Sequence, residues 1–512
     1  MKTFAAIDVG SYEISMKIFQ MAPKGAMKEI DHIRHKMDLG SETYNTGKLS
    51  SAKVEELVRI LREYMHILKS YKVDDYKVYG TSAIREMANT AIVLGQIEQR
   101  TGIHIDVLSN SEQRFLDYKS VASKGDVFRS IIEKGTVIVD IGGGSVQLSL
   151  FDKDVLVSTQ NLRIGVLRIQ ESLRQLNALP SKSEMLIEEM VASQFSVFQK
   201  LYLKDRQIDN IIVVDDYLSR WMQGLHLGSD RQGYVDAAYY KEFMDKLRHC
   251  KSADSYKEFG VSQDTTGLFF ASAVMVNCMM EMLGAGQLWA PGVSLCDGIA
   301  YEYAEKEKLI KDGHDFEKDI LACAKSISKR YMGSRKRAEI LENLTLSIFD
   351  HTKKYHGLGK RERLYLQIAA ILSDCGKYIS LANLGECAYN IIMSTEMIGL
   401  SHMEREIVAD TVKFNHDEFV YFEELSKESS LDRNAYLVMA KLTAILRLAH
   451  GLDRSHKQKF KDVKISDKDG KLVFTVQTNA DITLEKGLFA HKAAFFEEVF
   501  NIQPAIRQKN SF

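Results

Sequence analysis

Two stretches of the chain share one layout, and this repeat limits the folds that the chain can adopt. Residues 6–11 read AIDVGS and residues 138–145 read IVDIGGGS. Each is an apolar run that carries an aspartate and ends in glycine and serine, which predicts a buried strand and a tight turn. A second, alternating strand follows each copy. Two such units predict a duplicated α/β domain in which two glycine-bearing hairpins face a shared cleft.

Strand-like and helical patterns alternate through the first half of the chain. Short apolar runs predict strands at 77–80 and 103–108, and apolar positions at helical spacing predict a helix at 52–70. Alternating strands and helices are typical of an α/β sheet. We therefore place a first α/β lobe at residues 1–125 and a second at residues 126–305.

The remainder of the chain has a different pattern. After a charged linker, every strong pattern up to residue 455 is helical. Alternation returns at 461–477, where Lys468-Asp469-Gly470 offers a hairpin turn, and a last helix follows. We therefore expect an all-helical domain at residues 316–455 and a small α+β tail at residues 456–512.

Composition excludes several classes of protein. The 68 lysine and arginine residues nearly balance 69 acidic residues, for a formal net charge of −1. A uniformly basic DNA-binding protein is therefore excluded, and a polyanion would need a local basic patch. The six cysteines form no C-x-x-C pair, which argues against a zinc knuckle or a disulfide framework. No signal peptide or membrane span is evident, so we expect a cytoplasmic protein without a membrane partner.

The glycine hairpins predict a phosphate site. Glycine lets the backbone turn sharply and direct several N–H groups at one phosphate, while an aspartate at the strand end can bind Mg²⁺ or position water. One such motif is usually only a turn, but two matched copies favour phosphate binding. The predicted phosphate-binding residues are Gly10, Ser11, Gly142, Gly143, Gly144 and Ser145, and the predicted metal ligands are Asp8 and Asp140.

Arg85 is a further phosphate-binding candidate. It stands near the start of a predicted helix, directly after the strand at 77–80. A guanidinium at that place could clamp a phosphate through two hydrogen bonds. The alternative is a surface ion pair with Glu86.

These segments together resemble a known family. The chain resembles the exopolyphosphatase/guanosine pentaphosphate phosphohydrolase (Ppx/GppA) family in segments that keep the family's order and spacing: 6–11, 81–86, 139–145, 163–168 and 295–298. Beyond Phe316, the segments 444–449 and 452–455 resemble the HD-type helical domain of its longer members. The resemblance implies a duplicated actin-like (ribonuclease H-like) two-lobed fold, an HD-like domain and a small C-terminal tail.

The resemblance also implies an activity. Family members hydrolyse the terminal phosphoanhydride of inorganic polyphosphate, or remove the 5′ γ-phosphate of pppGpp, with Mg²⁺, and we expect a homodimer. A glutamate on the helix after the strand at 103–108 activates the attacking water. Such chemistry needs N–H groups, arginine and metal to neutralise the phosphates, and a carboxylate to orient water.

The sequence departs from the family at four places in the expected cleft. Gln113 stands at the catalytic glutamate position, where an amide can hydrogen-bond water but cannot take its proton. Glu112 is the candidate substitute base, although adjacent helical positions point roughly 100° apart. The other departures are Gln147 in place of a glutamate, Tyr12-Glu13 in the first hairpin, and Asp215-Asp216-Tyr217 after the apolar strand at 211–214.

The helical domain shows similar losses. Asp374, His351, His402 and His416 remain, but Ser373 precedes Asp374 where a histidine is expected, and His450 stands where an aspartate is expected. This is no metal-ligand pattern, and a metal-free domain is favoured. Basic runs such as 335–337 and 360–363 are either solvated helix faces or part of a channel for a long polyanion.

Two hypotheses follow, from different classes. The first is a Mg²⁺-dependent phosphoanhydride hydrolase with Glu112 and Gln113 at its catalytic position. The alternative is a catalytically weakened relative that binds or senses polyphosphate, (p)ppGpp or ATP. A kinase of the same superfamily is a third, weaker candidate, because the Arg85 segment and the HD-like half argue against it.

Overall fold

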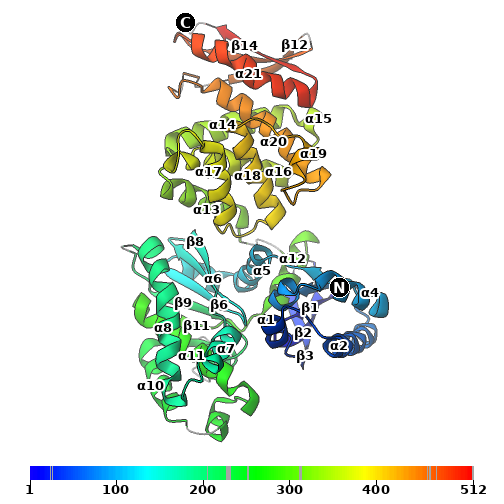
Figure 1. Cartoon of the computed structure of the whole chain (residues 1–512), viewed down its shortest axis with the longest axis vertical. Coiled ribbons are helices and arrows are strands. Elements are labelled where there is room, and N and C mark those ends of the chain that lie inside the picture. The colour runs from blue at the N-terminus through cyan, green and yellow to red at the C-terminus, as the bar shows by residue number, and fades with distance from the viewer. Residues whose placement is uncertain are drawn as a thin grey trace. The chain divides into compact units, whose positions relative to one another are not determined.

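The structure is a computed structural model. It describes residues 1–23, 25, 27–204, 206–225, 232–250, 253–310, 314–457, 459–460, 463–468 and 470–509. These residues form two compact units, Met1–Phe316 and Glu317–Phe512, drawn in Figure 1.

The first unit contains two sheets with the same topology. The first sheet has the order β3-β2-β1-β4-β5, and the second has the order β8-β7-β6-β9-β11-β10. In each sheet the first three strands pair antiparallel, and two further strands, β4 and β5 or β9 and β11, run parallel to the first. The second sheet has one more edge strand, β10, antiparallel to β11. The bounds are β1 Lys2–Val9, β2 Glu13–Met21, β3 Met27–Lys36, β4 Asp75–Gly80, β5 Asp106–Val107, β6 Thr136–Ile141, β7 Val146–Asp152, β8 Val155–Leu162, β9 Asn210–Val214, β10 Tyr234–Asp236 and β11 Gln287–Trp289. The duplication predicted from the repeated motif is therefore present in the sheets.

Each sheet also has a third strand that the sequence pattern did not predict. β3 is an edge strand, and most of its side chains are exposed or half-buried. An edge strand tolerates charged side chains on both faces, so it lacks the apolar alternation from which strands are predicted.

The strand register places the two glycine hairpins at equivalent positions. Val9 pairs with Ile14 in the first sheet, and Ile141 pairs with Val146 in the second. Four residues remain between the paired ends in both cases. One step back along each strand, Asp8 lies opposite Ser15, and Asp140 lies opposite Gln147.

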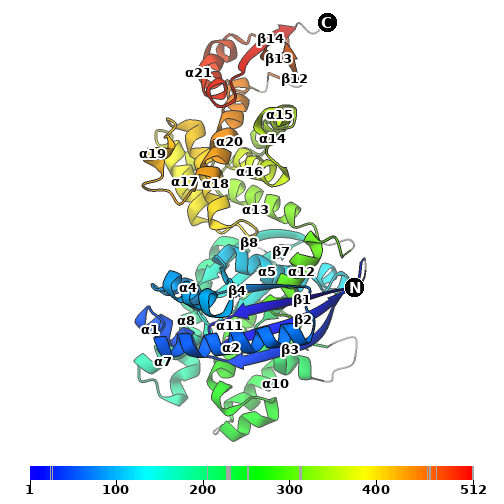
Figure 2. The same ribbon diagram turned by 90° about the vertical axis from the view of Figure 1, so that its right-hand side faces the viewer.

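Helices cover both faces of the first sheet. α2 (Ser51–Ser70) packs on one face through an apolar stripe that includes Leu57 and Leu61 (Figure 2). The other face is covered by α5 (Asn110–Ala122) and α12 (Leu295–Lys306). α12 therefore belongs to the first sheet, although our predicted boundaries placed residues up to 305 in the second lobe.

A buried ion pair explains why α12 returns to the first sheet. Lys17 Nζ, on β2, lies 2.9 Å from Asp297 Oδ2 on α12 and 2.9 Å from Glu29 Oε2 on β3. Lys17 is 5% exposed, so its charge needs these partners. The pair joins segments 280 residues apart, which no local sequence pattern reveals.

The other helices of the first unit complete the two lobes. Those beside the first sheet are α1 Gly40–Thr46, α3 Ser82–Glu86 and α4 Thr90–Thr101. α6 (Asp126–Ile132) lies beside the second sheet, where Asp154 N–H and Asn210 Nδ2 donate to the carbonyl oxygens of Ile132 and Ile131. The others around the second sheet are α7 Val166–Gln175, α8 Pro180–Phe198, α9 Leu218–Gly224, α10 Ala237–Arg248 and α11 Thr266–Leu283. Two helical segments of the described chain, Gln263–Leu283 and Arg433–Leu452, are long and apolar enough to cross a membrane, but 67% and 78% of their apolar windows are buried. Such burial is typical of core helices.

The second unit is helical up to its C-terminal sheet. Its helices are α13 Phe316–Arg330, α14 Arg335–His351, α15 Lys353–His356, α16 Lys360–Leu372, α17 Leu384–Ser394, α18 His402–His416, α19 Phe422–Leu425, α20 Arg433–Leu452 and α21 Thr483–Phe500. β12 (Val463–Lys468) and β13 (Lys471–Gln477) form the predicted antiparallel hairpin, and β14 (Gln503–Lys509) pairs parallel to β13. Asp469, in the predicted turn, lies outside the described residues.

An arginine occupies the place in the helical unit where a metal was considered. Arg337 on α14 is ion-paired with Asp374, and its Nε lies 3.8 Å from Asp453 Oδ2. Arg337 and Asp453 are 8% and 4% exposed. Burial raises the pKa of Asp374, but the charges of Arg337 and Lys377 outweigh it and hold that pKa below its usual value. The guanidinium thus neutralises two carboxylates that would otherwise suit a cation.

Of the histidines considered as metal ligands, His416 lies near Asp374, but they form no metal site with these carboxylates among the described residues. His416 Nε2 hydrogen-bonds the Ser373 carbonyl oxygen at 2.8 Å, and its ring lies 5.5 Å from that of His450. His351 faces Asp467 at 3.7 Å, and His402 begins α18. Among the described residues, no group of three or more histidine, cysteine, aspartate or glutamate side chains is arranged to hold a metal ion.

We expect Arg337→Met to lower the free energy of unfolding of the second unit by about 3–5 kcal/mol, because two buried carboxylates lose their cation. Thermal unfolding of the full chain, followed by calorimetry, measures the change. Arg335→Met is the matched control: its side chain is 92% exposed and pairs with Glu339 on the surface, so we expect a loss of about 1 kcal/mol or less. Equal losses in the two variants would contradict a structural role for Arg337.

Candidate active site

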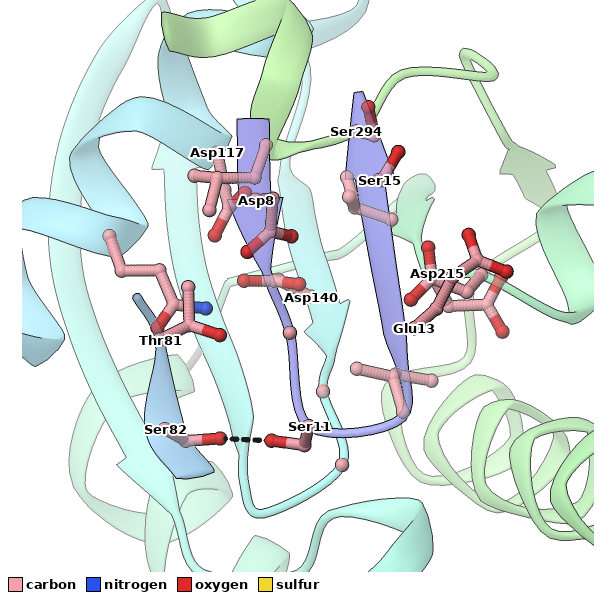
Figure 3. A pocket seen from close by; sticks show the side chains of 18 of the residues that line it. Asp8, Ser11, Glu13, Ser15, Thr81, Ser82, Asp117, Asp140, Asp215 and Ser294 are labelled. Carbon is pink, nitrogen blue, oxygen red and sulfur yellow. Dashed lines mark hydrogen bonds between the residues drawn. The ribbon is translucent and has the colours of Figure 1, made fainter. Parts of the chain in front are cut away.

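The two glycine hairpins meet at one cavity of about 140 Å³ between the two sheets. Figure 3 shows carboxylate and hydroxyl groups that line it. All but one of the predicted site residues line this cavity: Asp8, Gly10, Ser11, Arg85, Gln113, Asp140, Gly142, Gly143, Gly144 and Ser145. The structure therefore brings together residues more than 130 positions apart in the chain.

Close backbone packing holds the hairpins against each other. A Cβ atom added to Gly143 would lie 2.8 Å from Leu167 Cδ1 and 3.4 Å from the Ser11 Cβ of the other hairpin. A Cβ added to Gly165 would lie 2.3 Å from both the Gly143 carbonyl oxygen and the Ser145 nitrogen. Only glycine fits at position 165, because any side chain there would displace backbone.

The hairpin amides divide into two groups. Gly10 N–H donates to the Glu13 carbonyl oxygen at 3.1 Å, and Gly142 N–H donates to the Ser145 carbonyl oxygen at 2.9 Å. These two bonds close the turns, so neither amide serves a phosphate. Within the described chain, the N–H groups of Ser11, Gly143 and Gly144 donate to no protein acceptor, which leaves the tips of both hairpins as anion-binding backbone.

The Ser11 hydroxyl belongs to a cluster of three hydroxyl groups. Its Oγ lies 2.8 Å from Ser82 Oγ (Figure 3). Tyr44 Oη lies 2.9 Å from Ser11 Oγ and 2.7 Å from Ser82 Oγ. Three hydroxyls can satisfy one another in a ring. Ser11 therefore ties the first hairpin to α1 and α3 as well as lining the cavity.

Arg85 is bound mainly by protein atoms. Its Nη1 donates to the Leu108 carbonyl oxygen at 2.6 Å and to Gln113 Oε1 at 3.3 Å, and its Nη2 donates to Asn110 Oδ1 at 2.6 Å. The surface ion pair with Glu86 is not formed, because Glu86 pairs with Arg168 at 2.7 Å. Arg85 thus fixes the segment that begins α5.

The contact with Arg85 also orients the Gln113 side chain. A guanidinium only donates, so the amide oxygen of Gln113 must face it. The Nε2 amino group then lies on the other side of the amide. Since Gln113 lines the cavity, it presents a hydrogen-bond donor rather than an acceptor to a ligand.

Glu112 lies outside the cavity lining. Its Oε2 accepts the Ser109 N–H at 3.0 Å, and its own N–H donates to Ser109 Oγ at 3.3 Å, which forms a capping box at the start of α5. The expected substitution of Glu112 for the catalytic glutamate is not supported, because the carboxylate already caps the helix. The helix would have to unwind locally before Glu112 could turn inward.

Three aspartates face one another in the cavity. Asp8, Asp117 and Asp140 come from β1, α5 and β6, and their side chains point together in Figure 3. Burial raises the pKa of Asp140 to about 6. Burial, and then the charge of Asp140, raises the pKa of Asp117 well above its usual range, and burial with nearby acids does the same for Asp8. Without a cation, this cluster holds protons near neutral pH.

Sequence reasoning missed Asp117 and Arg114. Both are on α5, line the cavity, and are 8% and 5% exposed. Arg114 lies close enough to Asp140 to lower its pKa against the effect of burial. Asp117 stands four residues after Gln113, so the two side chains lie on one face of the helix. That spacing was the available signal: an acid one turn beyond the expected catalytic position.

The two acids after β9 have different roles. Asp215 accepts the backbone N–H groups of Leu218 at 2.9 Å and Ser219 at 2.6 Å, and the Ser272 hydroxyl at 2.6 Å, so it caps α9. Asp216 is exposed in the cavity, where it makes no hydrogen bond or ion pair with a described residue. Only Asp216 is therefore available to a ligand.

The acidic cluster fits Mg²⁺ better than a metal held by protein alone. No three carboxylate, imidazole or thiol groups among the described residues are arranged around one ion. Mg²⁺ commonly uses one or two carboxylates and takes its remaining oxygens from water and substrate phosphates. Asp8 Oδ1 is buried without a hydrogen-bond partner among the described residues, which suits an oxygen ligand awaiting a cation.

Comparison with known proteins establishes the family. Residues 18–307 match the Ppx/GppA phosphatase family, and residues 321–492 match Ppx/GppA phosphatase domain III. The chain belongs to the Ppx/GppA phosphatase family. The first match covers more than half of the chain but begins after the first glycine hairpin. The assignment of Asp8, Gly10 and Ser11 to the site therefore depends on the structure and not on this match.

Individual relatives are distant. The guanosine-5'-triphosphate,3'-diphosphate pyrophosphatase of Photobacterium profundum is 20% identical over 479 residues, 92% of this chain and 91% of its own. The solved exopolyphosphatase from Cytophaga hutchinsonii has a TM-score of 0.52 at 14% identity, over 61% of this chain and all of its own. The Aquifex aeolicus Ppx/GppA family member has a TM-score of 0.50 at 20% identity, over 60% of this chain and 98% of its own. These structural matches establish a shared fold.

The aspartate cluster predicts an inverse pH dependence of stability in metal-free buffer. Because the pKa of Asp140 rises from 3.8 to about 6 on folding, the folded state binds more protons, and stability falls as pH rises from about 4 to 6. Asp117→Asn removes one like charge. We expect it to raise the free energy of unfolding at pH 8, with EDTA present, by about 1–3 kcal/mol.

Thermal unfolding at pH 5 and pH 8 measures both effects. Asp106→Asn, on the exposed strand β5, is the control and should change neither value by more than about 0.5 kcal/mol. A lower stability of Asp117→Asn at pH 8 would show that this carboxylate is well paired, contrary to the account above.

Proposed function

We propose that this protein is a phosphoanhydride hydrolase that releases the terminal phosphate of inorganic polyphosphate or the 5′ γ-phosphate of pppGpp. The observation that carries this proposal is the convergence of two glycine hairpins on a cavity lined with carboxylates. The names of the relatives, a guanosine pentaphosphate pyrophosphatase and an exopolyphosphatase, support the same reaction class. The repeated sheet topology supports the duplicated actin-like fold that the family resemblance implies.

Substrate phosphates are held by groups from both lobes. The N–H groups of Gly143 and Gly144 and the Nε2 of Gln113 donate to phosphoryl oxygens, and Arg114 supplies positive charge from α5. Asp8 and Asp140 would hold Mg²⁺ together with the phosphates. When bound, the ion neutralises charge on the phosphate chain and on the aspartates.

Asp117 takes the water-orienting place that Gln113 cannot fill. Its carboxylate lies one turn along the same face of α5 and lines the cavity. In the reaction, the water oxygen bonds to the terminal phosphorus as the bond to the bridging oxygen breaks. The leaving chain takes that electron pair, and the hydrogens of water leave with the released phosphate. Asp117 accepts a hydrogen bond from the water and aims its lone pair at phosphorus.

The second candidate function is a binding protein that senses polyphosphate, (p)ppGpp or ATP. The observation that favours it is the fixed orientation of Gln113, whose oxygen is held by Arg85, at the position of the family's catalytic glutamate. In that case the cleft would bind the same phosphates without releasing any. The two candidates differ in turnover and share the binding groups.

We expect Asp117→Asn to lower kcat for phosphate release by about 10²–10⁴-fold, because the attacking water loses the acceptor that orients it. The assay follows free phosphate from long-chain polyphosphate, pppGpp and ATP, with Mg²⁺ and with EDTA. Glu112→Gln is the matched control, five residues earlier on the same helix. Its amide oxygen can still accept the Ser109 N–H, so we expect activity within about twofold of wild type.

The outcomes separate the hypotheses. Full activity in Asp117→Asn with loss in Glu112→Gln would restore Glu112 as the base, against the capping geometry. If the wild type releases no phosphate from any of the three substrates with Mg²⁺ but still binds them saturably, the hydrolase hypothesis is wrong and the sensor hypothesis takes its place.

A further inference from the structure

The two faces of the C-terminal sheet differ. α21 packs on one face, where Leu472, Phe474 and Val476 of β13 are buried and the Phe474 ring lies 5.9 Å from that of Phe489 (Figure 2). Because side chains alternate along a strand, the residues between these point to the opposite face. They are exposed or half-buried, and so are their partners on β12 and β14. The sheet therefore presents an open face to solvent.

The open face is basic. The strand register brings Lys464 of β12 into one row with Arg507 of β14, and it places Lys468 directly opposite Lys471. Lys509 follows on the same face of β14, two residues after Arg507. All five side chains are exposed and make no ion pair within the described chain, and no described residue of this face is acidic. We call these five cations the basic face.

The basic face differs from the basic runs that stand out in the sequence. Its cations come from three strands, so no run of the sequence reveals them. Since the formal net charge of the chain is −1, only such a local patch can attract a polyanion. The runs at 335–337 and 360–363 are instead largely neutralised by ion pairs: Arg335–Glu339, Arg337–Asp374, Lys360–Glu317, Arg361–Glu404 and Arg363–Asp350.

One pair on the basic face is unfavourable in the free protein. Lys468 and Lys471 face each other across the hairpin. Like charges at directly opposed positions destabilise a sheet. An anion bound at this pair removes the repulsion, so the pair favours a ligand-binding face over one that is only solvated.

The five cations form two groups. Lys468 and Lys471 lie at the hairpin end of the sheet, whereas Lys464, Arg507 and Lys509 lie toward its other end. Four residue steps along β12 separate Lys464 from Lys468, which corresponds to about 13 Å at about 3.3 Å per residue. Two separated groups suit a ligand that carries two lines of negative charge.

A neutral strip lies between the two groups. Ser466, Val473 and Ala505 form one row across the three strands, and their side chains are short. The described part of this face has no aromatic ring on which a single-stranded base could stack, and no side chain long enough to read the deep major groove of B-DNA. A flat strip flanked by cations matches the minor groove of A-form RNA, which is wide and shallow and displays 2′-hydroxyl groups between two phosphate backbones.

We propose that the basic face binds double-stranded RNA across its minor groove, with one group of cations on each phosphate backbone. Ser466 lies between the groups, where its hydroxyl can exchange a hydrogen bond with a ribose 2′-hydroxyl. Recognition is by shape and charge and is independent of base sequence. Inorganic polyphosphate is less well matched, because its charges follow a single chain. This inference goes beyond the proposed function and does not rest on it.

Fluorescence anisotropy with the full chain in EDTA tests the inference. The probe is a labelled RNA duplex of about 20 base pairs with 5′-hydroxyl ends, which offers the active site no terminal phosphoanhydride. The comparison ligands are a DNA duplex of the same sequence, one RNA strand alone, and long-chain polyphosphate as a competitor. We expect the RNA duplex to bind at least about tenfold more tightly than the DNA duplex or the single strand, with an affinity that falls steeply as salt rises.

Variants assign the binding to the basic face. Lys468→Gln/Lys471→Gln should weaken RNA binding about tenfold or more and reduce the slope of log affinity against log salt by about 2, one for each lost phosphate contact. Arg507→Gln tests the other group and should reduce the slope by about 1. Lys329→Gln/Lys336→Gln is the matched control, because it removes the same charge from exposed positions of the helical part, and it should keep the affinity within about twofold.

The contrary results are equally definite. Equal affinity for the RNA and DNA duplexes would overturn the choice of RNA, and equal affinity for duplex and single strand would overturn the fit to a groove. Equal losses in the two double variants would show that only net charge matters. If polyphosphate binds more tightly than RNA and loses that affinity in Lys468→Gln/Lys471→Gln, the face is a polyphosphate site and this inference is wrong. If no nucleic acid binds, the inference also fails, whereas the proposed function is decided separately by phosphate release.

Discussion

The active site depends on the contact of two backbone turns. Gly143 and Gly165, both in the second lobe, pack so closely that a Cβ at either position would overlap a neighbour, and the Ser11 Cβ of the first hairpin lies 3.4 Å from where a Gly143 Cβ would be. This approach places the ends of β1 and β6 side by side, which in turn places the carboxylates of Asp8 and Asp140 in one cavity. Larger side chains would separate the strand ends, and the cavity would lose its shape. Gly165 is therefore required by packing within the second lobe, whereas Gly143 and Gly144 face Ser11 and Tyr44 of the first lobe.

Gathering acids in that cavity has an energetic consequence. Asp8, Asp117 and Asp140 share a buried space, and burial raises the cost of ionising each of them, with the charges of Asp140 and Asp8 adding to that cost for Asp117. The same arrangement provides oxygen ligands for a cation and a carboxylate for water. Such opposition between stability and activity is common where a site must hold a charged substrate. In the helical unit, carboxylates that lie close together are neutralised by the protein itself, because Arg337 places a cation beside Asp374 and Asp453.

Much of the fold could be predicted from local patterns. The repeated strand and glycine motif led to the duplicated sheets, and helical spacing led to α2, whose ends agree with the predicted range 52–70 to within one residue. The edge strand β3 was missed because an exposed strand needs no apolar alternation. The place of α12 was missed because Lys17 and Asp297, which hold it, are distant in sequence. Of the candidate site residues, Glu112 alone lies outside the cavity lining, because its carboxylate caps the start of α5.

The sequence by itself determined which residues carry chemistry: two aspartates at strand ends, the glycine turns, and the family to which they belong. These features are local, and strand and turn propensities act over a few residues. Only the tertiary structure decided which carboxylate lines the cavity beside Gln113, and that Tyr12 and Tyr217 line the same cavity. Those relations depend on packing between segments that are far apart in the chain, and their free energies are realised only after the two lobes meet.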